Sequence, residues 1–257
     1  VTPRAARPKP LPRVSAPRPP RAPPVPAVAL HNATEAPPAA VETSAGEPLH
    51  PLVVAADEAL ISAAKGALDA LYKDRPIPRF YVLETVARVP YFAYLSCLHL
   101  WETLGDRHRA ARMRLHFAQS DNELQHLIIM EALGGGDSFP DRFLAKHAAV
   151  LYYWAVVLVY LVSPRQAYHL SELIEAHAFQ TYDAYLEEAG EWLRGQEAPQ
   201  CAVEYYGPSG AGARPGPGPA SLYDVFERVR DDEGEHREAL ACMARGGEGD
   251  LDECVVG

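Results

Sequence analysis

Two acid–histidine pairs with the same spacing are the residues of this sequence best suited to bind a metal. In the segment SDNELQHLIIM, Glu123 precedes His126 by three positions, and in RDDEGEHREAL, Glu233 precedes His236 by the same interval. Positions i and i+3 of a helix lie on one face, so each pair points two ligand side chains the same way. The alternative for each pair is a salt bridge at the protein surface.

A third pair has the same spacing, and we attribute it to chance. Glu47 and His50 lie in a Pro-rich stretch with no helical periodicity. About one Glu-x-x-His pair is expected by accident in a chain of this composition. We interpret this third pair as the accident, because the other two lie in segments with helical character.

A dinuclear iron centre in a helical bundle needs a glutamate from each of two further helices. Glu84 lies among apolar neighbours in VLETVARVP, and HLSELIEAHAFQTY offers both Glu172 and Glu175. A glutamate on an apolar face is costly to bury unless it is paired or bound to metal. Carboxylates offset the charge of two iron ions, and imidazoles add neutral nitrogen ligands. The pattern therefore predicts two iron ions, and the spacing leaves the choice between Glu172 and Glu175 open.

Helical periodicity dominates the part of the chain that must position these residues. Pro90 removes one backbone hydrogen bond, so we expect a kink near residues 86–90. Ser163 is a candidate N-cap, and Ser221 with Asp224 has near capping-box spacing. The sequence predicts an all-α fold, a ferritin-like di-iron four-helix bundle with about two additional helices. The expected helices cover residues 52–72, 79–105, 108–136, 141–162, 163–193 and 221–244.

Composition divides the chain into a core region and two flanks. Residues 1–51 hold 14 of the 24 prolines and are rich in Arg and Ala, which predicts disorder and a transit-peptide-like character. A Pro-rich linker or tail is the alternative. We expect the helical di-iron domain over 52–245, with a flexible Gly/Pro loop at 207–220, and a C-terminal tail at 246–257.

Net charge excludes some classes of partner, and cysteine spacing bears on the redox state of the cysteines. Beyond residue 50 the chain carries 18 basic and 31 acidic residues, a net charge of −13. Nucleic-acid binding needs a basic footprint, so we expect no nucleic-acid partner. Any membrane contact must come from apolar surface. The four cysteines have no CxxC spacing, and we expect reduced or packing residues, with a disulfide between two of them left open.

An apolar run of fifteen residues, from Ala148 to Val162, raises the question of membrane contact. A membrane-spanning helix needs about 20 apolar residues, so the run is short for a span. A half-buried core helix is one interpretation. The other is a helix lying in one leaflet with aromatic residues at the polar boundary, together with the apolar helix at 52–72. Monotopic membrane attachment fits both features better than a span.

Four separated segments carry a specific resemblance to a known family. The blocks RFYVLETVARVPYFAYLSCLHLWET, NELQHL, SPRQAYHLSELIEAHAFQTYD and LYDVFERVRDDEGEH resemble the plastid terminal oxidases, the plastid branch of the alternative oxidase family. The resemblance covers roughly residues 68–243. It implies a non-haem di-iron quinol oxidase on one membrane face, which oxidises plastoquinol and reduces dioxygen to water.

The resemblance also implies roles for particular residues. It favours Glu175 over Glu172, and it makes Tyr182 a catalytic residue, a candidate electron or hydrogen donor. His99, Leu127, Tyr160 and Asp232 match supporting positions around the site, although each taken singly also fits a packing or surface position. The implied metal ligands are Glu84, Glu123, His126, Glu175, Glu233 and His236.

Partners and location follow from the same resemblance. The expected location is the thylakoid membrane of the chloroplast, with plastoquinol and dioxygen as substrates and a homodimer left open. Three alternatives stay open at this stage. These are a mitochondrial-type ubiquinol oxidase, another di-iron protein for iron storage or hydroxylation, and a non-enzymatic membrane-associated scaffold.

Overall fold

The computed structural model describes residues 49–105, 110–246 and 254. The described part is built of α-helices with no strand longer than an isolated bridge between Glu197 and Ser221. The predicted all-α class is therefore confirmed. The helices are α1 (Pro51–Tyr72), α2 (Pro76–Ala87), α3 (Val89–Thr103), α4 (Ala110–Ala132), α5 (Phe139–Val162), α6 (Pro164–Arg194), α7 (Gln200–Tyr206) and α8 (Leu222–Arg245).

The helix expected over 79–105 is two helices rather than one kinked helix. α2 ends at Ala87 and α3 begins at Val89, so the break falls inside the predicted 86–90 window. Pro90 near the start of α3 has no backbone N–H to donate into the preceding turn, which accounts for the break. The short helix α7 lies in a region for which the sequence pattern predicted no helix.

The predicted caps of two long helices are present. The Ser163 side chain accepts a hydrogen bond from the backbone N–H of Gln166 at 3.3 Å, and Pro164 occupies the first helical position of α6. Ser221 and Asp224 form a complete capping box at the start of α8. These caps satisfy backbone N–H groups that have no partner inside the helix, and so they fix where each helix begins.

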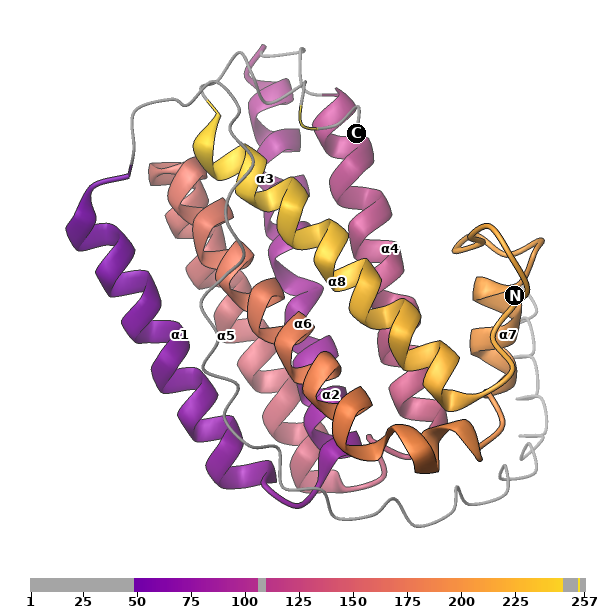
Figure 1. Ribbon diagram of the computed structural model, residues 1–257. Helices are drawn as coiled ribbons and strands as arrows, with labels where there is room; N and C mark the ends of the chain where they lie inside the picture. The colour runs from indigo at the N-terminus through magenta and orange to yellow at the C-terminus, as the bar shows by residue number, and fades with distance from the viewer. Residues whose placement is uncertain (1–48, 106–109, 247–253, 255–257) are drawn as a thin grey trace, which may run out of the picture.

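Figure 1 shows α6 and α8 side by side along much of their length, with α2, α3 and α4 behind them. α5 packs against α2 and α3, and α1 lies at the outside against α6. Two polar contacts hold α1 in place. Asp57 accepts a hydrogen bond from the ring of His169 at 3.0 Å, and Tyr72 donates one to Asp141 of α5 at 3.1 Å.

The apolar core consists of two clusters with polar residues between them. Along α6, Tyr168 belongs to one cluster and Tyr182 to the other, and Glu175 lies midway between them. The order is reversed along α8, where Val229 of the Tyr182 cluster and Leu240 of the Tyr168 cluster flank the second acid–histidine pair. The bundle therefore carries a buried polar layer between two apolar cores.

The structure corrects the cysteine expectation for one pair and leaves the flank expectations untested. Cys242 of α8 forms a disulfide with Cys254, which corrects the expectation of reduced or packing residues for this pair. Cys97 and Cys201 have free thiols. The sequence pattern could not identify the pair, because a spacing of 12 residues is compatible with many chain paths. The disordered segment expected over 1–51 and the tail over 246–257 lie largely outside the described residues.

The exposed face of α5 is apolar. Among the described residues, α5 is the one helix long and apolar enough to cross a membrane. Only 17% of its most apolar 18-residue stretch is buried inside the protein. The apolar residues exposed on it include Phe139, Phe143, Val150, Leu151, Trp154, Leu158 and Val162. Soluble proteins rarely leave a continuous apolar face of this kind uncovered.

Candidate metal centre

Six side chains predicted as metal ligands meet in the buried polar layer. They form two groups of four, and within each group the potential ligand atoms lie within 4.8 Å of one another. One group is Glu84, Glu123, His126 and Glu233, and the other is Glu123, Glu175, Glu233 and His236. Because Glu123 and Glu233 belong to both groups, the arrangement is that of two adjacent metal positions with two shared carboxylates.

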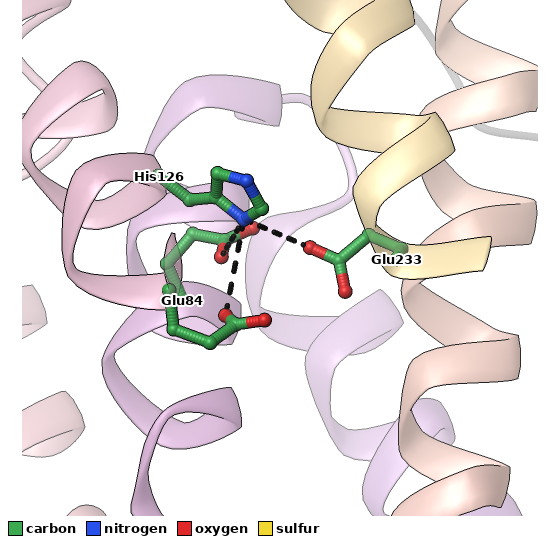
Figure 2. Close-up of side chains that lie close together, drawn as sticks. Glu84, His126 and Glu233 are labelled. Atoms are coloured by element: carbon green, nitrogen blue, oxygen red, sulfur yellow. Dashed lines mark ion pairs between the residues drawn. The ribbon is translucent and has the colours of Figure 1, made fainter. Parts of the chain in front are cut away.

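Four helices supply these side chains. Glu84 comes from α2 and Glu175 from α6, whereas α4 and α8 each supply one acid–histidine pair. Figure 2 shows Glu84, His126 and Glu233 pointing toward one another from three different helices. The Nδ1 atom of His126 lies 3.6 Å from Oε2 of Glu84 and 3.2 Å from Oε1 of Glu233. The i, i+3 spacing therefore directs both side chains of a pair inward, as the sequence analysis expects.

Most of the potential ligand atoms lack a hydrogen bond. The buried atoms without one are Oε2 of Glu84, both carboxylate oxygens of Glu123 and Glu233, Oε2 of Glu175, and Nδ1 of His126 and His236. Buried polar atoms are nearly always hydrogen-bonded, because an unsatisfied one costs about 1–3 kcal/mol. A cluster of such atoms converging on two positions is the donor arrangement that a pair of cations would satisfy.

The electrostatics of the cluster without cations are unfavourable. Burial, and then the neighbouring carboxylate of Glu84, raises the pKa of Glu123 well above its ordinary value. Burial and the charge of Glu123 raise the pKa of Glu233 in the same way. Burial and Glu123 raise the pKa of Glu175 to about 7. Four carboxylates in one dry layer repel each other, and divalent cations would remove that repulsion.

The donor set fits a pair of iron ions. Carboxylate oxygens and neutral imidazole nitrogens are ligands that iron accepts, and two glutamates plus two Glu-x-x-His pairs form the known donor set of di-iron carboxylate bundles. Burial lowers the pKa of His236, which favours the neutral imidazole that metal binding requires. The residues present therefore fit the group that the sequence pattern predicts.

Two tyrosines hold carboxylates of the cluster. Tyr182 is fully buried and donates a hydrogen bond to Oε1 of Glu84, and its ring stacks on Phe80 with the centroids 4.3 Å apart. Tyr91 donates a hydrogen bond to Oε1 of Glu175 at 2.7 Å. Each tyrosine occupies one oxygen of its glutamate and leaves the other oxygen without a hydrogen bond.

Asp232 anchors the outer nitrogen of His126. Its Oδ2 atom lies 3.0 Å from Nε2 of His126 and accepts hydrogen bonds from Tyr206 at 2.7 Å and from Asn122 at 2.8 Å. Burial alone raises the pKa of Asp232, but the hydrogen bond and charge of His126 outweigh it, and the net pKa is well below the usual range. A carboxylate held in this way fixes the orientation of the imidazole, so that Nδ1 faces the cluster.

The remaining predicted residues lie at different distances from the cluster. Leu127 is a buried core residue next to His126, and Tyr160 is buried and hydrogen-bonded to Tyr168 at 2.7 Å, inside the second apolar core. His99 is exposed on α3, so the structure does not bring it to the cluster. Glu172 is only partly buried and belongs to neither group of ligands.

Three residues around the cluster were missed from the sequence. Tyr91 lies on an apolar helix, where a tyrosine resembles any other core residue. Tyr206 and Asn122 gave no signal of their own, because their role depends on the short helix α7 meeting α4. The one sequence feature that could have indicated hydrogen-bonding groups nearby is the acid Asp232 directly before the predicted ligand Glu233.

Fold and site together define a helical bundle with a buried carboxylate–histidine centre of the dinuclear type. Comparison with known proteins then gives the family, because the family profile described as "Alternative oxidase" matches residues 52–245. The chain belongs to the alternative oxidase family. The predicted resemblance is thereby confirmed at the level of the family.

Individual relatives agree with this assignment. The chain is 48% identical over 191 residues to the "Ubiquinol oxidase 4, chloroplastic/chromoplastic" of Arabidopsis thaliana, covering 70% of this chain and 54% of that protein. It is 28% identical to the "Ubiquinol oxidase" of Trachipleistophora hominis, covering 72% of this chain and 56% of that protein. It is also 28% identical to the "Alternative oxidase 3, mitochondrial" of Glycine max, over 66% of this chain and 50% of that protein. The chain thus spans about half the length of these relatives.

Proposed function

We propose that this protein is a non-haem di-iron quinol oxidase that oxidises plastoquinol and reduces dioxygen to water. The observation that carries the proposal is the buried layer of carboxylate and imidazole atoms without hydrogen bonds, in two groups with two shared glutamates. Family membership supports the same reaction, since the named relatives are quinol or alternative oxidases.

The residues of the cluster have separable tasks in this proposal. Glu84, Glu123, His126, Glu175, Glu233 and His236 would hold two iron ions. Bound iron would supply the dioxygen binding and electron transfer that side chains alone do not provide. Reduction of dioxygen to two waters consumes four electrons and four protons, and two quinols release that number. The apolar cores on both sides of the layer exclude bulk water from it.

Tyr182 would serve as the electron or hydrogen donor of the site. Its hydroxyl hydrogen points to Oε1 of Glu84, and burial with the charge of Glu84 raises the pKa of the phenol well above its ordinary value. The phenol is therefore neutral at physiological pH, and its hydrogen is held inside the dry layer. That placement supports a role in the O–O cleavage step and not only in packing.

Membrane attachment would be monotopic, through α5 and α1. α5 packs one side against α2 and α3 and exposes an apolar face on the other, which is the pattern of a helix lying on a membrane. α1 adds Leu52, Leu60 and Leu71 as exposed apolar side chains. An apolar quinol must enter from the lipid, so a protein attached to one membrane face would have direct access to its substrate.

The plastid assignment rests on the degree of similarity. Identity to the chloroplastic/chromoplastic relative is 48%, against 28% to the mitochondrial relative from Glycine max. We therefore favour plastoquinol and the thylakoid membrane over ubiquinol and the mitochondrion. A homodimer stays a prediction that the mass of the detergent-purified protein would test.

The test combines metal analysis with oxygen uptake on the full chain purified in detergent. We expect about two iron ions per chain, and oxygen uptake that depends on quinol and is faster with a plastoquinol analogue than with a ubiquinol analogue. His236→Ala should lose iron and activity together. Activity in an iron-free preparation, or iron-loaded protein that consumes no oxygen with either quinol, would contradict the proposal.

A further inference from the structure

The two oxygens of the Asp232 carboxylate bind different partners on opposite sides. Oδ2 faces inward and takes the hydrogen bonds from His126, Tyr206 and Asn122. Oδ1 faces the loop at 207–220 and forms an ion pair with the guanidinium of Arg214. The orientation of the carboxylate, and with it the contact to His126, is therefore determined from both sides.

Arg214 is well placed to hold this carboxylate. It is the one charged residue in the sequence GPSGAGARPGPGPA, and its Nη2 atom also lies 2.9 Å from Oε1 of Glu235, one turn further along α8. The Asp232 side chain is only 9% exposed, whereas that of Arg214 is 28% exposed. A carboxylate buried to this degree is costly unless a cation or several hydrogen-bond donors compensate for it.

The loop is shaped to bring Arg214 to this position. The backbone N–H of Gly212 donates to the carbonyl of Tyr205 at 3.0 Å, and a Cβ at Gly212 would lie 2.5 Å from the Tyr205 ring. A Cβ at Gly210 would lie 2.0 Å from the Tyr205 carbonyl oxygen. Only glycine allows the loop to run this close to the end of α7. The glycines therefore have a packing reason, beyond the flexibility that their number predicts.

We propose that Arg214 is a positioning residue of the metal centre, which fixes the Asp232 carboxylate so that Asp232 in turn orients His126 toward the metal. The inference rests on the proposed function in one respect, namely that His126 is a metal ligand. It makes the surface loop at 207–220 a structural part of the site. Loss of a group that orients a metal-binding histidine typically weakens metal binding about 10–100-fold.

The experiment measures ferrous iron binding to metal-free, full-length protein in detergent, by competition with a chelator. Arg214→Gln should weaken iron binding about tenfold, at the low end of the range because Arg214 acts through Asp232. Arg214→Lys should weaken iron binding less than Arg214→Gln does, since lysine keeps the positive charge but lacks the planar guanidinium with its several N–H donors. The Mössbauer spectrum of the iron-loaded Arg214→Gln protein should change for one of its two iron environments, the one that His126 serves.

Arg230→Gln is the matched control. Arg230 is exposed to a similar degree, with 22% of its side chain accessible, and it pairs with Asp183 and Asp231 instead of Asp232. Its loss therefore changes the net charge equally. Iron binding by Arg230→Gln should equal that of the wild type. In an Asp232→Asn background, Arg214→Gln should cause no further loss, because the connecting carboxylate is already changed.

Each other outcome overturns the inference. Wild-type iron affinity in folded Arg214→Gln protein, an equal loss in Arg230→Gln, or losses that add in the double variant would exclude a role through Asp232. If Arg214→Gln does not fold, as judged by circular dichroism, unchanged iron binding and spectra in Arg214→Lys would also count against it. Failure of the wild type itself to bind iron would overturn the proposed function as well, so the two failures are distinguishable.

Discussion

The hydroxyl of Tyr182 on α6 donates a hydrogen bond to Oε1 of Glu84 on α2. These two residues are 98 positions apart in the sequence, and the contact joins a predicted donor directly to a predicted ligand. A tyrosine that only filled space would not need to place its hydroxyl on a carboxylate of the cluster. This relationship makes Tyr182 the first residue to test.

Replacing Tyr182 with Phe removes the hydroxyl and keeps the ring that stacks on Phe80. We expect iron content to stay at the wild-type level, because no ligand is lost, while quinol oxidation falls steeply. The loss of one buried hydrogen bond should cost about 1 kcal/mol of stability. Iron content, melting temperature and oxygen uptake on one preparation would check this. Near-normal turnover with full iron would remove Tyr182 from the mechanism and leave the metal assignment intact.

Glu175 and Glu172 provide a matched pair of substitutions one helical turn apart. Glu175 lies in the cluster, whereas Glu172 is only partly buried and outside both groups. Glu175→Ala should abolish iron binding and activity, and Glu172→Ala should leave iron bound. Metal analysis of both purified variants decides the matter. The opposite result, with iron lost only from Glu172→Ala, would show that the ligand assignment on α6 is wrong.

The apolar face of α5 should hold the protein on membranes. Leu151 and Leu158 are 74% and 65% exposed, so changing both to Glu should leave the fold intact while weakening membrane binding strongly. Val203→Glu on α7 is the control, since Val203 is also exposed but lies on a different helix. Sedimentation with vesicles would measure binding, and high salt should not release the wild type. Release by salt alone would indicate an electrostatic attachment instead.

The buried His116 predicts a pH dependence of stability. Burial lowers the pKa of His116 to about 4, from an ordinary value near 6.5, so the folded chain keeps it neutral while the unfolded chain binds a proton. Stability is therefore lost as the pH falls from about 6.5 to about 4, by at most roughly 3 kcal/mol for this group. Below that window its contribution no longer changes.

The comparison of wild type with His116→Gln isolates this effect from other titrating groups. Across the window the wild type should lose more free energy of unfolding than the variant, which has no imidazole to protonate. Urea unfolding at several pH values between 4 and 8 would give both curves. A difference between the curves that is independent of pH would mean that His116 is protonated equally in the folded and unfolded states.

Local sequence patterns were sufficient where the structure depends on neighbours along the chain. The i, i+3 spacing placed Glu123 with His126 on one helix face, and the proline at position 90 located the break between α2 and α3. The capping box at Ser221 followed from the same local rules. Recurrence of the acid–histidine spacing on a second helix then indicated a shared site.

Features that depend on the path of the chain were not predictable in this way. The choice between Glu172 and Glu175 requires the rotation of α6 about its axis, which spacing alone does not give. α7 is only seven residues long and has no helical periodicity to detect. Arg214 lies in a Gly/Pro segment typical of a linker, so its contact with Asp232 required the folded structure.

The polar layer between the two apolar cores should also affect the lifetime of the protein in the cell. Four buried carboxylates destabilise the closed bundle unless cations balance them, so bound metal should stabilise the folded chain. We therefore expect a chain that lacks metal to open more often and to be degraded faster. A cell short of iron should therefore contain less of this protein. Iron supply would then set the abundance of the protein, and with it the rate of the quinol oxidation proposed above.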